Sequence, residues 1–197
     1  HSSQPRLGRN AIEAAGPALQ ALAGLRAELE GEHSPWAEHF PEAPFVTLNA
    51  GVIQGGVAAN VIPDRCEIVL GLRPLPGVSS AELRARVLAA VAVAAPEADP
   101  EVAVLGDSPP MVCPEAALVR QALAELTGDH GTHGVSFASD AGPLQALGIE
   151  SVLFGPGSIA EAHRANEFLP KDEFVRAGEV MAALVRRCCE LEAEEAP

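Results

Sequence analysis

Positive charge is scarce in this 197-residue chain, and its scarcity excludes several classes of partner. The sequence contains 13 lysine and arginine residues against 27 aspartate and glutamate residues, which gives a formal net charge of -14. A net charge of this sign repels phosphate backbones and anionic lipid head groups. We therefore expect no nucleic acid and no membrane surface among the partners.

Long hydrophobic runs and paired cysteine motifs are lacking as well. Apolar runs such as Val87–Ala95 are shorter than the roughly 20 residues that a bilayer span needs, and no charged-then-apolar signal segment opens the sequence. These absences predict a soluble, cytoplasmic protein. The four cysteines show neither a C-x-x-C spacing nor the density of a disulfide scaffold, which favours buried free thiols; they are Cys66, Cys113, Cys188 and Cys189.

The residues that are present indicate a globular protein with an α+β first unit. Hydrophobic residues make up 48% of the chain, enough to bury a core in one or two domains. Apolar spacing and a terminal glycine predict a helix over Asn10–Glu30. Runs of apolar and β-branched residues predict antiparallel strands at 45–52 and 66–73, then a helix over 79–95 and a short strand at 101–105.

This order of elements lacks only a first strand to make a ferredoxin-like two-layer sandwich. The first residue is His1 rather than Met and lies inside a motif, so we expect an upstream portion. The proline- and glycine-rich stretch Gly106–Pro114 is typical of a domain boundary. We therefore assign residues 1–106 to one domain and 107–197 to another.

The second domain is predicted to be part of a parallel-sheet α/β domain, because helices and strands alternate along it. Helices are expected at 115–126, 141–147 and 171–192, and strands at 134–138 and 151–154. The acidic tail Glu190–Glu195 is expected to be solvated.

A glycine-rich turn followed by a histidine is the sharpest candidate for chemistry. Phe154-Gly155-Pro156-Gly157-Ser158 leads from a predicted strand to Ala162-His163. Glycine lets backbone N–H groups approach an anion, and a neutral imidazole can bind a metal. A loop histidine beside a structural turn is the alternative, since one ligand does not make a metal site.

Two further candidates lie in the first unit. His1 stands where a strand would turn into a helix, a place from which an imidazole can donate to a developing oxyanion; a helix-capping segment or a tag remnant would look the same. Arg73, on a predicted strand, could hold a substrate carboxylate through two parallel hydrogen bonds, or form a surface salt bridge. The remaining histidines are interpreted as structural or exposed: His33, His39, His130 and His133.

Six separated motifs resemble, in order, the zinc aminoacylase and carboxypeptidase family, which includes acetylornithine deacetylase and succinyl-diaminopimelate desuccinylase. The motifs are His1-Ser2-Ser3, Gly8 with Asn10-Ala11-Ile12, Asn60-Val61-Ile62-Pro63, Arg73-Pro74, Ser139-Asp140-Ala141, and the Gly-Pro-Gly turn with Ala162-His163. The resemblance covers residues 1 to about 187. Within the family, Thr47-Leu48-Asn49 and Phe154-Gly155-Pro156-Gly157-Ser158 are most similar to acetylornithine deacetylases.

The resemblance implies a ferredoxin-like lid, through which two subunits form a homodimer, and a catalytic α/β domain that binds two zinc ions, with cobalt as a possible substitute. His163 would be a zinc ligand, and His1 would stabilise the tetrahedral oxyanion in the partner's active site. Asn60 and Arg73 would hold the substrate's polar groups and carboxylate. Ser139, Gly155 and Gly157 would belong to substrate-binding loops.

The family's first half, with its His-x-Asp ligand pair, bridging aspartate and Glu-Glu catalytic pair, has no match in this sequence. We therefore expect the 197-residue chain alone to be inactive, and a longer parent protein to remove the acyl group from an N-acylated amino acid such as N-acetylornithine. The alternatives are a dipeptidase or carboxypeptidase, a succinyl-diaminopimelate desuccinylase, or a non-catalytic dimerisation module.

Overall fold

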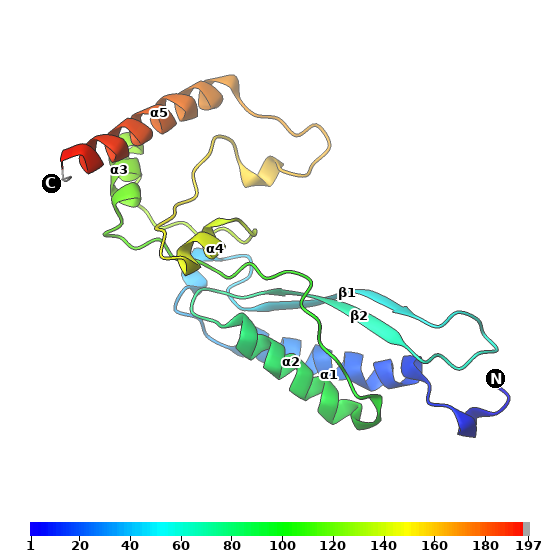
Figure 1. Cartoon of the computed structure of the whole chain (residues 1–197). Coiled ribbons are helices and arrows are strands. Elements are labelled where there is room, and N and C mark those ends of the chain that lie inside the picture. The colour runs from blue at the N-terminus through cyan, green and yellow to red at the C-terminus, as the bar shows by residue number, and fades with distance from the viewer. Residues whose placement is uncertain (195–197) are drawn as a thin grey trace. The chain divides into compact units, whose positions relative to one another are not determined.

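A computed structural model of the protein describes residues 1–194, which form two compact units (Figure 1). Unit 1 comprises His1–Pro110 together with Gly134–Ala138. Unit 2 comprises Met111–His133 and the chain from Ser139 onward. Each unit has a hydrophobic core of its own.

In unit 1, two helices pack on one face of a two-stranded antiparallel sheet (Figure 1). The strands are β1 (Thr47–Gly55) and β2 (Cys66–Arg73), and the helices are α1 (Ala11–Gly31) and α2 (Ser80–Ala94). Short 3-10 turns lie at Pro5–Leu7, Ala37–His39 and Pro96–Ala98. The register runs from the pair Thr47 and Arg73 to the pair Gly55 and Cys66, with a bulge between Ala50 and Val52.

The core of unit 1 forms because every element has one apolar face. Alternate residues of β2 turn toward the helices, as the period of two in a strand requires. The buried residues come from α1, from β1 and the residue before it, and from α2. Burying each large side chain contributes about 1.5–3 kcal/mol. The buried residues are Leu22, Leu25, Leu29, Val46, Leu48, Leu83 and Val87.

Unit 2 is built on the packing of α3 (Leu118–Thr127) against α5 (Lys171–Glu194). Ala122 and Leu123 contact Val180 and Leu184 in a second buried cluster. The short helix α4 (Ala141–Ala146) is tied to the preceding chain by Gln145, whose amide group exchanges two hydrogen bonds with the Val112 backbone at 3.1 and 2.6 Å. A 3-10 turn at Ile159–Glu161 completes the unit.

The mixed α+β class is confirmed, and the helix, strand, strand, helix order of unit 1 matches the prediction. Three predicted strands were wrong: residues 101–105, 134–138 and 151–154 are irregular. A strand exists only where a neighbour completes its hydrogen bonds, and the sheet of residues 1–194 contains β1 and β2 alone. The parallel α/β sheet expected in unit 2 is therefore absent from the described chain, as is the last strand of the ferredoxin-like order.

The cysteines are free thiols, as predicted, but the expected burial was wrong: Cys66, Cys113 and Cys188 are half-buried and Cys189 is exposed. Burial raises the pKa of the Cys113 thiol. Among the described helices, none combines the length and apolarity that crossing a bilayer requires. The side chains of the predicted acidic tail, Glu190–Glu195, lie outside the described part of the chain.

Candidate functional site

The segment before α1 and the loop between β1 and β2 lie together at one end of unit 1. The Ser2 N–H donates to the Asn60 carbonyl at 3.0 Å, and the Ala11 N–H donates to the Pro63 carbonyl at 2.9 Å. The side chain of Ile62 fills the space beside Gly8. Two of the predicted site residues, His1 and Asn60, are thereby brought to neighbouring positions although 59 residue steps separate them in the sequence.

The imidazole of His1 is oriented by its own turn. Its Nδ1 lies 3.1 Å from the Ser3 backbone N–H, which donates to it, and 2.7 Å from Ser3 Oγ. In a neutral imidazole a ring nitrogen that accepts carries no proton, so this geometry matches the tautomer with its proton on Nε2. The exposed His1 side chain can therefore donate through Nε2 to an acceptor outside the turn.

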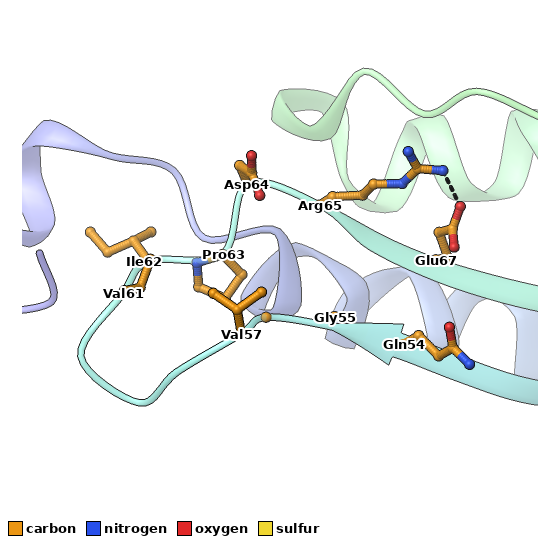
Figure 2. Close-up of a pocket in the computed structure, with 10 residues that line it drawn as sticks. Gln54, Gly55, Val57, Val61, Ile62, Pro63, Asp64, Arg65 and Glu67 are labelled. Carbon is orange, nitrogen blue, oxygen red and sulfur yellow. Dashed lines mark hydrogen bonds and ion pairs between the residues drawn. The ribbon is translucent and has the colours of Figure 1, made fainter.

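A shallow hollow of about 310 Å³ opens at the tip of the same hairpin (Figure 2). Its lining includes Gly55 and Gly56, at and just after the end of β1, and Val61, Ile62 and Pro63 from the loop. Gly56 has a φ of 74°, which favours glycine, and a Cβ there would contact Ile12 and Pro63. Arg65 is paired with Glu67 at the rim (Figure 2). The hollow is thus open and mixed in polarity, and the charge of Arg65 is already balanced.

Arg73 is not brought to this hollow. It lies at the opposite end of β2, paired with Thr47, and seven residue steps from Cys66 place it about 23 Å away at the usual rise of about 3.3 Å per residue. Its side chain is exposed and forms no hydrogen bond or ion pair with another described residue. The guanidinium is therefore available to an external carboxylate, but within one subunit it cannot share a ligand with Asn60.

In unit 2 the Gly-Pro-Gly turn is an exposed loop in which the N–H group of its last glycine, Gly157, is already hydrogen-bonded. Gly157 has a φ of 87°, and its N–H donates to Glu173 Oε2, on the first turn of α5, at 2.8 Å. Gly155 has open space where a side chain would be. The anion that contacts this turn is thus an internal carboxylate, and the N–H of Gly157 is turned toward it.

His163 has a left-handed backbone with a φ of 61°, and a glutamate four residues later fixes it. The His163 N–H donates to Glu167 Oε2 at 3.0 Å. The histidine side chain is exposed. Glu173 was not singled out from the sequence, although a glutamate three residues after a proline at a helix start was a usable signal.

Ser139 lies just before α4. Its Oγ accepts a hydrogen bond from the Ala141 N–H at 3.3 Å, which supports the start of that helix. This is a local role, and the substrate-binding role expected from the sequence stays a prediction.

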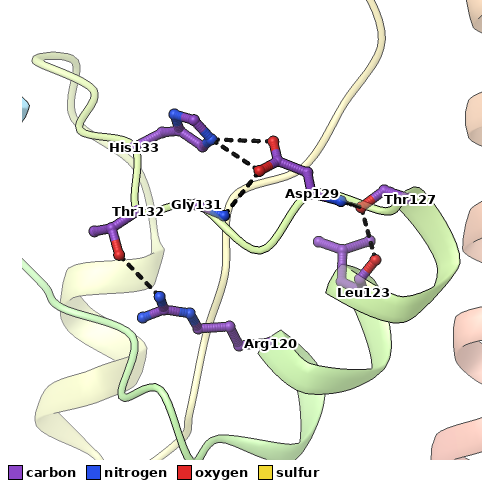
Figure 3. A network of polar contacts seen from close by, with 7 residues as sticks. All are labelled: Arg120, Leu123, Thr127, Asp129, Gly131, Thr132 and His133. Carbon is purple, nitrogen blue, oxygen red and sulfur yellow. Dashed lines mark hydrogen bonds and ion pairs between the residues drawn. The ribbon is translucent and has the colours of Figure 1, made fainter.

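Polar contacts that the sequence did not predict brace the loop after α3 (Figure 3). The Asp129 carboxylate accepts from the Gly131 N–H at 2.9 Å and pairs with His133 Nε2 at 3.0 Å. These contacts lower the pKa of Asp129, the Gly131 hydrogen bond most strongly. Arg120 donates to Thr132 Oγ1 at 2.9 Å. His133 is exposed and serves a turn, as expected of it.

The described side chains do not by themselves fit a complete zinc centre. A catalytic zinc site uses three protein ligands and a water, whereas no group of three histidine, cysteine, aspartate or glutamate side chains in the described part of the chain is placed to hold a metal ion. His163 offers one exposed imidazole and no partner ligand. No chemical step can therefore be assigned to a metal held by these residues alone.

The chain is similar to longer known proteins and covers only a part of each. It is 35% identical to an acetylornithine deacetylase of Myxococcus xanthus over 96% of this chain and 50% of the relative. It is 33% identical to an acetylornithine deacetylase of Edwardsiella ictaluri over 96% of this chain and 49% of the relative. The chain thus spans about half the length of these curated relatives.

A solved structure supports the fold. A tripeptidase from Staphylococcus aureus superposes with a TM-score of 0.61 at 20% identity, covering 93% of this chain and 47% of the tripeptidase. Residues 1–99 match the family model described as the peptidase dimerisation domain, and these residues include the whole helix and sheet arrangement of unit 1. The chain therefore belongs to the peptidase dimerisation domain family.

Proposed function

We propose that the whole protein to which this chain belongs is a zinc-dependent amide hydrolase that removes the acyl group from an N-acylated amino acid, with N-acetylornithine as its substrate. One observation carries the proposal: the similarity to two acetylornithine deacetylases extends over 96% of the chain. Residues 1–106 would form the lid, and residues 107–197 would form part of the catalytic domain.

The metal of the whole protein would be zinc, or cobalt in its place, and His163 would supply one ligand. The remaining ligands would come from residues outside this chain, because His163 is the single metal-ligand candidate at this turn and no described group of three stands in for them. The described residues would therefore contribute one imidazole, that of His163, to the metal site.

Substrate-binding roles are proposed for residues in each unit. Arg73, exposed and unpaired among the described residues, fits a substrate carboxylate, for which a guanidinium offers two parallel hydrogen bonds. Asn60, beside His1, would bind polar groups, and Ser139, Gly155 and Gly157 would line the catalytic side. His1, with its proton on Nε2, would donate to the oxyanion, a role worth about 10²–10³ in rate.

The position of Arg73, at the end of β2 away from the loop that carries Asn60, supports a homodimer as the working form. The length of β2 from Cys66 to Arg73 is about 23 Å, more than one small substrate bridges, so a partner subunit would supply the missing contacts. Sedimentation equilibrium of the whole protein tests the dimer, and a monomer at micromolar concentration with full activity would contradict it. The expected cytoplasmic location remains a prediction.

The decisive experiment measures zinc content and hydrolysis by the whole protein. N-acetylornithine, succinyl-diaminopimelate and a dipeptide should be compared at equal concentration, with Arg73→Ala as a variant and Arg65→Ala, whose charge is paired with Glu67, as its matched control. We expect two zinc ions, fastest turnover of N-acetylornithine and a higher KM in Arg73→Ala alone. Turnover of only the dipeptide would move the substrate to the peptidase class.

A second function, a non-catalytic dimerisation module, is favoured by the absence of a three-ligand group among the described residues. It predicts a whole protein that dimerises without binding zinc. We expect the 197-residue chain alone to be inactive under either function, so zinc-dependent turnover by the purified chain would contradict that expectation and exclude the non-catalytic module.

A further inference from the structure

One hydrogen bond joins the Gly-Pro-Gly turn to a helix that starts fourteen residues later in the sequence. The Gly157 N–H donates to Glu173 Oε2 at 2.8 Å. On its other side, a Cβ added to Gly157 would lie 3.0 Å from Leu169 Cδ1, and the φ of 87° is one that side chains other than glycine avoid. The turn is therefore fixed between a carboxylate and an apolar side chain.

Glu173 is free to make this contact because of the proline that precedes α5. The Phe174 N–H donates to the Pro170 carbonyl at 3.1 Å, which makes Pro170 the N-cap and Glu173 the third residue of the helix. In the capping-box motif, a glutamate at this position accepts from the backbone N–H of the N-cap residue. Proline has no N–H, so the carboxylate binds Gly157 instead.

We infer that Glu173 is a positioning residue, which holds the Gly155–Ser158 turn in the conformation that meets the polar end of the substrate. The inference rests on the proposed function, which assigns Gly155 and Gly157 to substrate contacts. A charged acceptor makes a stronger and shorter hydrogen bond than a neutral one. A binding loop must be held to within about 0.5 Å to work. Glu173 itself contacts the turn and no reacting atom.

The test compares three variants of the whole, zinc-loaded protein: Glu173→Ala, Glu173→Gln and the control Asp172→Ala. Asp172 carries the same charge on the same helical turn, is exposed, and makes no hydrogen bond with a described residue. We expect Glu173→Ala to raise the KM for N-acetylornithine about tenfold, the scale of losing one ordered contact, with kcat, zinc content and Tm nearly unchanged. Glu173→Gln should lie between, because its amide oxygen still accepts.

Hydrogen exchange gives a second readout that needs no activity. The peptide spanning residues 154–159 contains the Gly157 amide, and Pro156 contributes none. Faster exchange there in Glu173→Ala but not in Asp172→Ala supports the inference. Unchanged exchange and KM in Glu173→Ala, or equal effects in Asp172→Ala, would overturn it. If the unaltered protein hydrolyses no N-acyl amino acid while Glu173→Ala still accelerates exchange, the proposed function fails and the anchoring of the turn by Glu173 is retained.

Discussion

The ion pair between Arg86 and Glu32 stabilises a carboxylate that lies at the unfavourable, C-terminal end of a helix. Glu32 follows α1 as its C-cap, where the partial negative charge of the helix disfavours a carboxylate. Arg86 on α2 donates to both its oxygens, at 3.1 and 2.7 Å. These hydrogen bonds lower the pKa of Glu32, against a smaller opposing effect of burial. The pair therefore links α1 to α2 at the C-terminal end of α1, where a positive side chain offsets the unfavourable position of the Glu32 carboxylate.

The Glu32 pair predicts a pH dependence of stability. Because the pKa of Glu32 is lower in the folded state than in the unfolded state, its contribution is complete above the unfolded value and is lost as the pH falls through the folded value. Half of the Glu32 side chain is exposed, so solvent limits the contribution to about 1 kcal/mol or less. Denaturant unfolding of the chain at pH values from about 3 to about 7, a range that includes the ordinary glutamate pKa of about 4.3, measures it.

Glu28 supplies the matched control for this prediction. It lies 3.7 Å from Arg86 without a hydrogen bond and is more exposed than Glu32. Glu32→Gln should lower the free energy of unfolding at neutral pH and flatten its acid dependence, whereas Glu28→Gln should do little. Equal effects from the two variants would assign the pH dependence to general charge and not to the hydrogen-bonded pair.

The residues of the candidate site could be predicted as types but not as neighbours. His1, Asn60 and Arg73 stood out because imidazole, amide and guanidinium groups carry recognisable chemistry. The hairpin register decides that His1 lies near Asn60 and that Arg73 does not. The hydrophobic period and the composition of the strands do not specify this register. Glu173 was missed because its partner is a backbone N–H, which every non-proline residue possesses.

At the scale of elements, the N-caps of α1 and α2 differ in quality. Asn10 Oδ1 accepts from the N–H groups of Ile12 and Glu13 at 3.0 and 3.3 Å, and its Nδ2 donates to the Glu13 carboxylate. Ser79 Oγ accepts only from the Glu82 N–H, at 3.4 Å. The α1 cap therefore satisfies more of the groups that a helix start leaves unpaired.

This difference predicts unequal costs of capping substitutions. Asn10→Ala should lower the free energy of unfolding by about 1–2 kcal/mol, and Ser79→Ala by about 0.5 kcal/mol, within the range measured for caps. Asn10→Asp keeps the acceptor and should recover most of the loss. Urea unfolding followed by circular dichroism measures all three, and a Ser79→Ala cost as large as that of Asn10→Ala would contradict the geometric ranking.

The helices and the hairpin could be predicted closely, and the isolated strands could not. α1, α2 and α5 have local signals, namely a capping residue or a 3.6-residue apolar period, and local signals suffice for a helix. The apolar runs at 101–105, 134–138 and 151–154 have β-forming composition but no described partner strand. Whether such a run forms a strand depends on pairing with a neighbouring strand, which its own residues do not determine.

At the scale of the whole molecule, the two units have cores with no residue in common. Leu29, 1% exposed, lies in the core of unit 1, and Leu184, 9% exposed, lies between α3 and α5 in unit 2. Truncating a buried leucine to alanine costs about 2–5 kcal/mol, with more open sites at the lower end. The exposed Leu105 and Leu147 offer matched controls, one in each unit.

We predict that each core substitution weakens chiefly its own unit. Leu29→Ala should accelerate hydrogen exchange in α1, α2 and the hairpin, and Leu184→Ala should accelerate it in α3 and α5, because protection depends on the core that each element helps to bury. Leu105→Ala and Leu147→Ala should change stability by no more than about 0.5 kcal/mol. Mass-spectrometric exchange on the four variants distinguishes the cases: uniform acceleration across both units after either core substitution would mean that they unfold as one cooperative body, and the separate cores would then not define separate folding units.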